Sequence, residues 1–129
     1  MTASPKIKIA LIEDDRAIVQ MYTMRFGFSD DLEVKVANDG AGGLELIKTY
    51  HPDVILLDMM MPTMSGAEML TKLRDLPNGN DYQVIALTNM KDDDIMDRIH
   101  DLGVQAYLVK AEVPPEKIEA HVRELATKK

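Results

Sequence analysis

The sequence contains no cysteine among its 129 residues. Disulfide bonds and thiolate metal sites are therefore excluded, and nothing in the composition points to an oxidising compartment. The chain also lacks any run approaching the roughly 20 apolar residues that a membrane-spanning helix needs. Residues 1–10 lack the apolar segment of a signal peptide. These absences predict a cytoplasmic protein that does not contact a membrane.

Basic residues are scarce relative to acidic ones. The chain has 15 lysines and arginines against 22 aspartates and glutamates, which gives a formal net charge of −7. The acidic runs at 13–15 and 92–94 would repel a phosphate backbone, so we expect no direct binding of nucleic acid. An acidic surface suits a cation site or a basic partner protein, although surface charge of this size can also serve solubility alone.

Short apolar runs recur at fairly even intervals and have the length of strands. Four of them are almost continuously hydrophobic, which is typical of strands covered on both faces of a parallel sheet. These runs are Ile7–Ile12, Val54–Leu57, Val84–Leu87 and Ala106–Val109. A fifth run, 32–36, alternates apolar and polar residues, so we expect it at an edge of the sheet.

Helical patterns lie between and after these strands. Apolar residues at i, i+4, i+7 spacing predict four helices. Their apolar residues are Ala17, Met21 and Met24; Met69, Leu73 and Leu76; Ile95, Ile99 and Leu102; and Ile118, Val122 and Leu125. A weaker fifth helix follows Asp39, and Asp15 is expected to cap the first helix.

The β-α unit is therefore repeated five times, which predicts an α/β fold with a doubly wound parallel sheet. A chain of this length, with 46% hydrophobic residues, suits one domain with one substantial core. We expect a single domain over residues 1–129, with no output domain, because the predicted elements use up the sequence.

Polar residues follow the carboxyl ends of several predicted strands. Glu13 and Asp14 follow the first strand, Asp58 the third, Thr88 the fourth and Lys110 the fifth. Ligands of open parallel sheets bind at this edge, so we expect these side chains to gather there. Clustered carboxylates repel one another unless a cation lies among them.

Magnesium fits such a cluster best. It prefers oxygen ligands and commonly joins one or two carboxylates to a phosphate, whereas no histidine or thiol lies near these strand ends to favour zinc or copper. A carboxylate can also attack phosphorus and form an acyl phosphate. The transferred group then needs charge neutralisation, which Lys110 and the metal would supply, and a hydrogen bond, which Thr88 could donate.

Four segments together resemble the receiver domains of two-component response regulators. They are KIKIALIEDD (6–15), PDVILLDMMMPTMSG (52–66), VIALT (84–88) and GVQAYLVK (103–110). The resemblance runs almost from end to end, and the pieces stand in the family's order and spacing. It implies the flavodoxin-like (βα)5 arrangement with strand order 2-1-3-4-5.

The resemblance also implies a role for each site residue. Asp58 matches the phosphoacceptor and Asp14 a direct magnesium ligand. Glu13 matches the acidic neighbour that reaches the metal through water, and Met60 the position whose backbone carbonyl binds it.

Three further positions complete the implied switch. Thr88 and Lys110 match the hydroxyl and the lysine that contact the phosphoryl group, and Tyr107 matches an aromatic switch that turns inward upon activation. The implied partners are a histidine kinase or phosphotransfer protein and a downstream protein that binds the face of helix four, strand five and helix five. Helix four is expected to begin at residues 91–94, whose three aspartates predict a partner with basic contacts.

Three departures from the family's pattern stand out. Ala111 follows Lys110 where a proline with a cis peptide bond is usual, so the bond here is either strained or trans, with Lys110 placed differently. Asn89 follows Thr88 where a smaller residue is usual. Met60 and Met90 are apolar at positions that govern attack by water, which predicts slow self-dephosphorylation.

Alternative interpretations remain open at this point. A hydrolase that forms an aspartyl phosphate is a second class, although such enzymes generally carry their nucleophile in a DxD pattern after the first strand. A third is a protein-binding module that works without phosphorylation, which Ala111 makes conceivable. The ten methionines are interpreted as core-filling residues, because thioether suits only soft metals.

Overall fold

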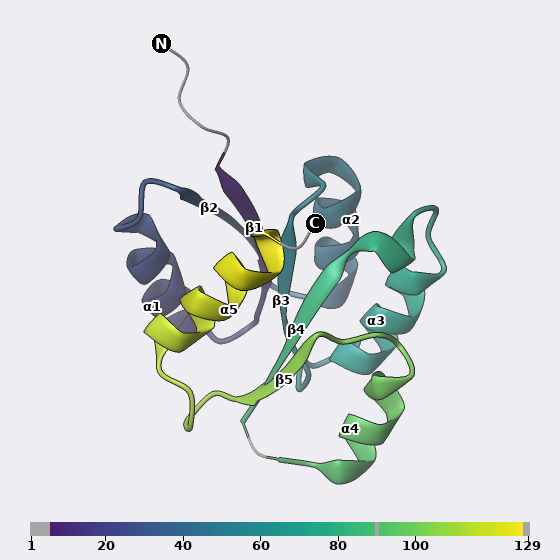
Figure 1. Cartoon of the computed structure of the whole chain (residues 1–129). Helices are drawn as coiled ribbons and strands as arrows, with labels where there is room; N and C mark the ends of the chain where they lie inside the picture. The colour runs from purple at the N-terminus through teal and green to yellow at the C-terminus, as the bar shows by residue number, and fades with distance from the viewer. Residues whose placement is uncertain (1–5, 90, 128–129) are drawn as a thin grey trace.

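A computed structural model describes residues 6–89 and 91–127, and its strands and helices alternate along the chain (Figure 1). The strands are β1 (Ile7–Ile12), β2 (Leu32–Ala37), β3 (Val54–Asp58), β4 (Gln83–Thr88) and β5 (Ala106–Val109). The helices are α1 (Arg16–Gly27), α2 (Gly40–Tyr50), α3 (Gly66–Arg74), α4 (Asp93–His100) and α5 (Pro115–Thr127), with a 3₁₀ turn η1 (Gly79–Asp81) before β4.

The five strands form one parallel sheet in the order β2-β1-β3-β4-β5. Figure 1 shows α1 and α5 on one face of the sheet and α2, α3 and α4 on the other. The doubly wound, flavodoxin-like (βα)5 fold and its strand order are thus confirmed. The alternating strand β2 lies at an edge, as expected, because only one of its faces is well buried.

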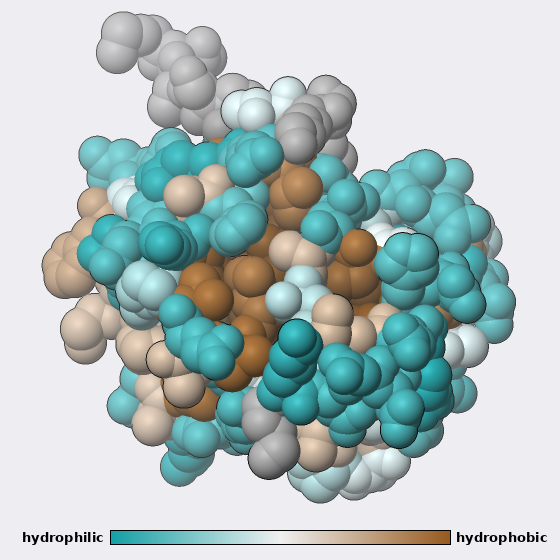
Figure 2. Space-filling model, turned by 60° about the horizontal axis from the view of Figure 1, so that its bottom comes forward, coloured by the Kyte–Doolittle hydropathy of each residue, from teal (hydrophilic) through white to brown (hydrophobic). Residues whose placement is uncertain are grey.

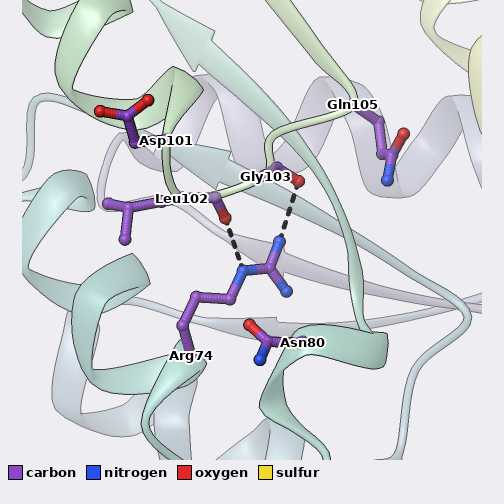
Figure 3. Close-up of a pocket in the computed structure, with 6 residues that line it drawn as sticks. All are labelled: Arg74, Asn80, Asp101, Leu102, Gly103 and Gln105. Carbon is purple, nitrogen blue, oxygen red and sulfur yellow. Dashed lines mark hydrogen bonds between the residues drawn. The ribbon is translucent and has the colours of Figure 1, made fainter.

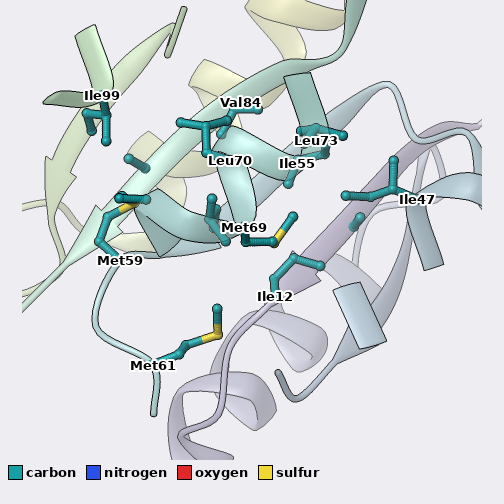
Figure 4. Close-up of a cluster of buried hydrophobic side chains, with 14 of the residues drawn as sticks. Ile12, Ile47, Ile55, Met59, Met61, Met69, Leu70, Leu73, Val84 and Ile99 are labelled. Carbon is teal, nitrogen blue, oxygen red and sulfur yellow. The ribbon is translucent and has the colours of Figure 1, made fainter. Parts of the chain in front are cut away.

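The sheet has a hydrophobic core on each face. Figure 4 shows the core under α2, α3 and α4, where Met59, Met61 and Met69 pack among isoleucine and leucine side chains. The other core lies under α1 and α5 and includes Tyr22 and Phe26, whose rings stack at 5.8 Å. These three methionines fill the core as expected, because the flexible thioether fits irregular spaces.

The residues whose spacing predicted the first helix do not form the buried face of α1. Met21 and Met24 are 43% and 65% exposed, whereas Tyr22 and Phe26 are about 1% exposed and make the contacts with the sheet. Met60 is 56% exposed, so the core-filling interpretation fails for these three methionines. The two apolar stripes on α1 have similar spacing, and the larger aromatic side chains take the buried side because they remove more apolar area from water.

Helix starts follow the capping signals in the sequence. The Asp15 side chain accepts hydrogen bonds from the N–H groups of Ala17 and Ile18, which confirms its capping role in α1. Asp92 caps α4 in the same way, so this helix begins at Asp93 rather than at Lys91. Within the described part of the chain, no helix is both long enough and apolar enough to cross a membrane.

Candidate functional site

Parallel strand ends bring the predicted polar residues to one edge of the sheet, the lower end in Figure 1. Glu13 and Asp14 follow β1, Asp58 is the last residue of β3, and Lys110 follows β5. One oxygen from each of the three carboxylates lies within 4.8 Å of the others. The sequence-based expectation that these acidic residues gather is therefore met by the geometry.

Lys110 is the cation of this cluster. Its Nζ lies 3.4 Å from Asp58 Oδ1 and forms an ion pair with Glu13 Oε1. The Lys110 side chain is about 10% exposed, while Glu13 and Asp58 are 1% and 3% exposed. Asp14 is exposed, so one side of the cluster is open to solvent.

The backbone of the β3–α3 loop also contacts Asp58. The Met60 N–H donates a hydrogen bond of 3.0 Å to Asp58 Oδ1. A Cβ on Gly66 would lie 2.6 Å from Met59 Cα and 2.7 Å from the Asp58 carbonyl oxygen, so only glycine lets α3 begin this close to β3. Sequence reasoning did not identify the Met60 N–H as a donor, because a backbone donor has no side-chain signature.

Burial and hydrogen bonding separate the two buried carboxylates. The pKa of Glu13 is raised to about 8, mainly by burial and then by its hydrogen bond with Asp58, and Lys110 offsets only part of this rise. Burial also acts to raise the pKa of Asp58, but hydrogen bonds from Glu13 and the Met60 N–H, with the charge of Lys110, outweigh it and lower that pKa. Asp58 is therefore the more acidic of the two buried carboxylates.

The donor set fits a magnesium ion. Three carboxylates converge with a single ammonium group, so one lysine cannot neutralise them all. All three carboxylates offer oxygen ligands, and the exposed side at Asp14 leaves room for the waters that magnesium retains. The residues present are therefore those of an acidic cation site.

Thr88 and Tyr107 lie on the two strands beyond Asp58. Thr88 ends β4, is 1% exposed, and accepts the Lys110 N–H through its carbonyl at 2.8 Å. Tyr107 is half-buried beside Ala86 and packs against the core under α2, α3 and α4. Its hydroxyl is buried and makes no hydrogen bond within the described part of the chain. The sheet thus places both predicted switch residues on the strands that border the acidic cluster.

Lys110 lies in the acidic cluster although Ala111 follows it. None of the described peptide bonds is cis, so the Lys110–Ala111 bond is trans, and Lys110 nevertheless reaches Glu13 and Asp58. Asn89 is exposed directly after Thr88. Met90, the second proposed shielding residue, lies outside the described residues.

Figure 3 shows a surface pocket that belongs to a different part of the molecule, at the end of α3 away from the acidic cluster. Its main polar residue, Arg74, donates hydrogen bonds to the carbonyls of Leu102 (2.7 Å) and Gly103 (3.0 Å). It also donates to the carbonyls of Gly79 and Tyr82. Since four carbonyls already engage the guanidinium, this pocket is a structural link between α3 and the α4–β5 turn.

Comparison with known proteins identifies the class that this fold and site define. The model of the response regulator receiver domain family matches residues 9–123. The chain belongs to this family. Receiver domains are signalling modules rather than metabolic enzymes, and they act with histidine kinases.

Individual relatives agree with this assignment. The response regulator MprA of Mycobacterium sp. (strain KMS) is 33% identical over 106 residues, which cover 81% of this chain and 44% of that protein. The chain thus spans less than half the length of this curated relative. The receiver domain of the response regulator NarL from Mycobacterium tuberculosis has a TM-score of 0.84 at 27% identity, over 98% of this chain and 100% of that one. A CheY-like receiver domain protein from Methanospirillum hungatei JF-1 has a TM-score of 0.81 at 28% identity, with the same coverage.

Proposed function

We propose that Asp58 accepts a phosphoryl group from a histidine kinase or phosphotransfer protein in a magnesium-dependent reaction, and that the new charge switches binding to a partner protein. The observation that carries this proposal is the buried Asp58 carboxylate, with Glu13 and Asp14 oxygens within 4.8 Å and Lys110 Nζ at 3.4 Å. We also propose that the protein is cytoplasmic. It has no cysteine, and the disulfide bonds that stabilise many exported proteins are rare in the cytoplasm.

Asp58 is prepared to act as the nucleophile. Its lowered pKa keeps a carboxylate oxygen free of a proton at neutral pH. That oxygen attacks phosphorus, the bond from phosphorus to the donor's imidazole nitrogen breaks, and the bonding electron pair returns to the imidazole. The product is an acyl phosphate on Asp58.

The neighbouring groups meet the charge that the transfer brings. Asp14, Asp58, the Met60 carbonyl and, through water, Glu13 would hold a magnesium ion, which would supply positive charge against the phosphoryl oxygens. Lys110 exchanges its contact with Asp58 Oδ1 for one with a phosphoryl oxygen, and the Thr88 hydroxyl donates a hydrogen bond to another. These residues pull the ends of β4 and β5 toward the modified Asp58.

The same movement would transmit the signal. Thr88 and Tyr107 lie on adjacent strands, and the unpaired Tyr107 hydroxyl has a hydrogen bond to gain from a rearranged β4–α4 loop. We place the downstream partner on the face of α4, β5 and α5. Asp92, Asp93 and Asp94 are exposed there and favour a partner with basic contacts. Unchanged partner affinity at low salt after all three are changed to Asn would contradict this assignment.

Met60 is expected to lengthen the lifetime of the acyl phosphate. Its side chain is 56% exposed on the residue whose N–H contacts Asp58, so an apolar group stands at the solvent-facing rim. The same role is proposed for Met90. Substituting polar residues at both positions should accelerate dephosphorylation, and an unchanged decay rate would refute the shielding role.

The test of the proposed function is the intact mass after incubation with acetyl phosphate and magnesium. We expect one added phosphoryl group on the native chain, none without magnesium, and none on Asp58→Asn. Asp75→Asn, which changes an exposed aspartate at the end of α3, serves as the matched control and should still be modified. Absence of an adduct on the native chain would instead favour a binding module that works without phosphorylation.

A further inference from the structure

A run of methionines follows the proposed phosphoacceptor. Four of the six residues after Asp58 are methionines, at 59, 60, 61 and 64. Met59 and Met61 are 2% and 7% exposed and lie in the core under α2, α3 and α4 (Figure 4), and Met64 packs against the same core. Met60 differs from the other three, because its side chain is 56% exposed. The fold thus buries the neighbours of Met60 and leaves its thioether accessible from solvent.

The backbone of Met60, rather than its side chain, contacts the site. Its N–H donates to Asp58 Oδ1 at 3.0 Å, a hydrogen bond that every residue except proline can make. The side chain lies outside the core, at the edge of the sheet that comes forward in Figure 2, where hydrophobic brown and hydrophilic teal surface are mixed. A chemical change at the Met60 sulfur can therefore alter the surface beside Asp58 while the fold and this hydrogen bond persist.

Few other methionines are accessible to a reagent in solution. Among the residues that the structure describes, Met21 and Met24 are the other exposed methionines, at 43% and 65%. Both lie on α1, whereas Met60 is two residues from Asp58 and contacts it through the backbone. Of the exposed methionines in the described part of the chain, Met60 is thus the one that follows the phosphoacceptor directly.

We propose that Met60 is an oxidation site, at which a peroxide converts the thioether to a sulfoxide and thereby shortens the lifetime of the acyl phosphate on Asp58. The oxidation site rests on the proposed phosphorylation of Asp58 and adds a second input to it. The phosphoryl donor sets whether the domain is modified, and the oxidant sets how long the modification lasts. Methionine sulfoxide is reduced back to methionine by dedicated reductases, so the change is reversible.

The oxidation is a two-electron transfer of an oxygen atom. A lone pair on Met60 Sδ attacks one oxygen of hydrogen peroxide, and the O–O bond breaks. The second oxygen takes up the proton of the first and leaves as water. The sulfur is oxidised and the peroxide is reduced, so that a polar sulfur–oxygen group stands where the apolar thioether stood.

The sulfoxide changes what water meets beside the phosphoryl group. In hydrolysis, a water oxygen attacks phosphorus while the bond from phosphorus to the Asp58 oxygen breaks, which releases inorganic phosphate and restores the carboxylate. The thioether of Met60 is at best a weak acceptor for that water. The sulfoxide oxygen accepts a hydrogen bond and so holds water near the acyl phosphate. Oxidation of Met60 should therefore accelerate dephosphorylation.

Limited treatment with hydrogen peroxide, followed by catalase and tryptic digestion, tests the site. Residues 49–72 form one tryptic peptide, which contains Met60 and the buried Met59, Met61 and Met69. Tandem mass spectrometry of this peptide should find added oxygen on Met60 well before it appears on the three buried methionines. Oxidation of the buried residues first, or of all four together, would overturn the assignment. The peroxide dose that modifies Met60 and spares the buried methionines is then used for the kinetic test.

The decay of the acyl phosphate tests the consequence. The oxidised chain is phosphorylated with acetyl phosphate and magnesium, the donor is removed, and intact mass follows the loss of the phosphoryl group. We expect oxidation to raise the decay rate about threefold or more. Met60→Leu keeps an apolar side chain that cannot form a sulfoxide, so it should decay slowly with and without peroxide. Met24→Leu, the matched change at an exposed methionine of α1, should respond to peroxide as the native chain does.

Phosphorylation and its control by oxidation can fail separately. A native chain that takes up no phosphoryl group before oxidation refutes the proposed function itself. A phosphorylated chain whose decay ignores oxidation of Met60, or an acceleration that persists in Met60→Leu, refutes only the role of the sulfoxide. Reduction of the oxidised native chain by methionine sulfoxide reductases should restore the slow decay, and a decay that stays fast would indicate irreversible damage instead.

Discussion

Helices α4 and α5 lie on either side of β5 (Figure 1) but are attached to the sheet in different ways. Along α5, Ile118, Glu119, Val122 and Leu125 are buried, and the Leu125 carbonyl accepts a hydrogen bond from Gln83 of β4 at 2.7 Å. In α4, Ile99 is the buried residue. The attachment of α5 thus extends over most of its length, and that of α4 is concentrated at its end.

The polar contacts of α5 and α4 differ in the same way as their apolar contacts. Glu119 is 4% exposed and accepts hydrogen bonds from Arg25, Ser29 and Arg123, which tie α5 to α1 and the loop after it. The turn after α4 is held by Arg74 through the carbonyls of Leu102 and Gly103 (Figure 3). In the amino-terminal half of α4, the partly buried Ile95 packs against the core, but no comparable polar contact is found in the described residues. An element that is held more firmly at one end can pivot, which is what the proposed switch requires of α4.

Removing the buried carboxylate of α5 should have the largest effect. Glu119→Ala removes three hydrogen bonds to a buried carboxylate and the packed stem of its side chain, and we expect the unfolding free energy to fall by about 3 kcal/mol. Urea unfolding followed by circular dichroism measures it. Glu116→Ala, an exposed position in the first turn of the same helix, should change stability by less than about 0.5 kcal/mol. Equal losses in the two variants would mean that the network does not hold α5.

Releasing the turn after α4 should have the next largest effect. Arg74→Met keeps the apolar stem but removes the donors to four carbonyls, and we expect a loss of about 2 kcal/mol. Amide hydrogen exchange should accelerate in α4 and at 102–103 more than in α5. Lys72→Met, at an exposed position of α3, is the matched control. Uniform acceleration in both helices would show that Arg74 does not act on α4 in particular.

Removing the cap of α4 should have a smaller and local effect. Asp92 accepts hydrogen bonds from the N–H groups of Asp94 (3.0 Å) and Ile95 (3.2 Å). Asp92→Ala should cost about 1 kcal/mol, seen as faster exchange in the first turn of α4 while α5 is unchanged. Asp93→Ala removes an equal charge but no cap, and a matching acceleration there would refute the capping explanation.

Lowering the pH should reduce the stabilisation of α5 by less than any of the substitutions above. Hydrogen bonds from Ser29, Arg25 and Arg123 outweigh the effect of burial and lower the pKa of Glu119 below its ordinary 4.5. Because folding lowers this pKa, the stabilisation that ionised Glu119 provides is complete above the ordinary pKa of 4.5. It is lost as the pH falls through the lower pKa of the folded protein. We expect less than about 1 kcal/mol, because both arginines are partly exposed. The unfolding free energy of Glu119→Gln, measured between pH 6 and 3, should lack this part of the pH dependence. A pH profile identical to that of the native chain would contradict the prediction.

Local patterns in the sequence predicted most of the fold. The four continuous apolar runs, the alternating run of β2 and the capping residue Asp15 were all interpreted correctly, because strand burial and helix capping depend on adjacent residues. Asp58 and Thr88 end their strands, and Glu13 and Lys110 directly follow theirs, so the edge of the sheet on which they meet followed from parallel topology.

Tertiary structure alone decided which of two similar stripes faces the core. The spacing of Ala17, Met21 and Met24 predicted a helix, but Tyr22 and Phe26 form its buried face, since spacing does not rank the volume that each side can bury. The sequence also did not predict the hydrogen bond from the Met60 N–H to Asp58 or the four carbonyls that accept from Arg74. Every residue type has the same backbone carbonyl, and all but proline have the same N–H, so such contacts leave no pattern in the sequence.

The sequence by itself therefore determined the β-α order, the sheet and the identity of the residues at its carboxyl edge, since each is encoded in hydrophobic periodicity and residue type. Only the tertiary structure decided how those residues share charge, which helices are fixed, and which apolar face is left in water. Distances and burial set these properties, and both arise from contacts between segments far apart in the chain.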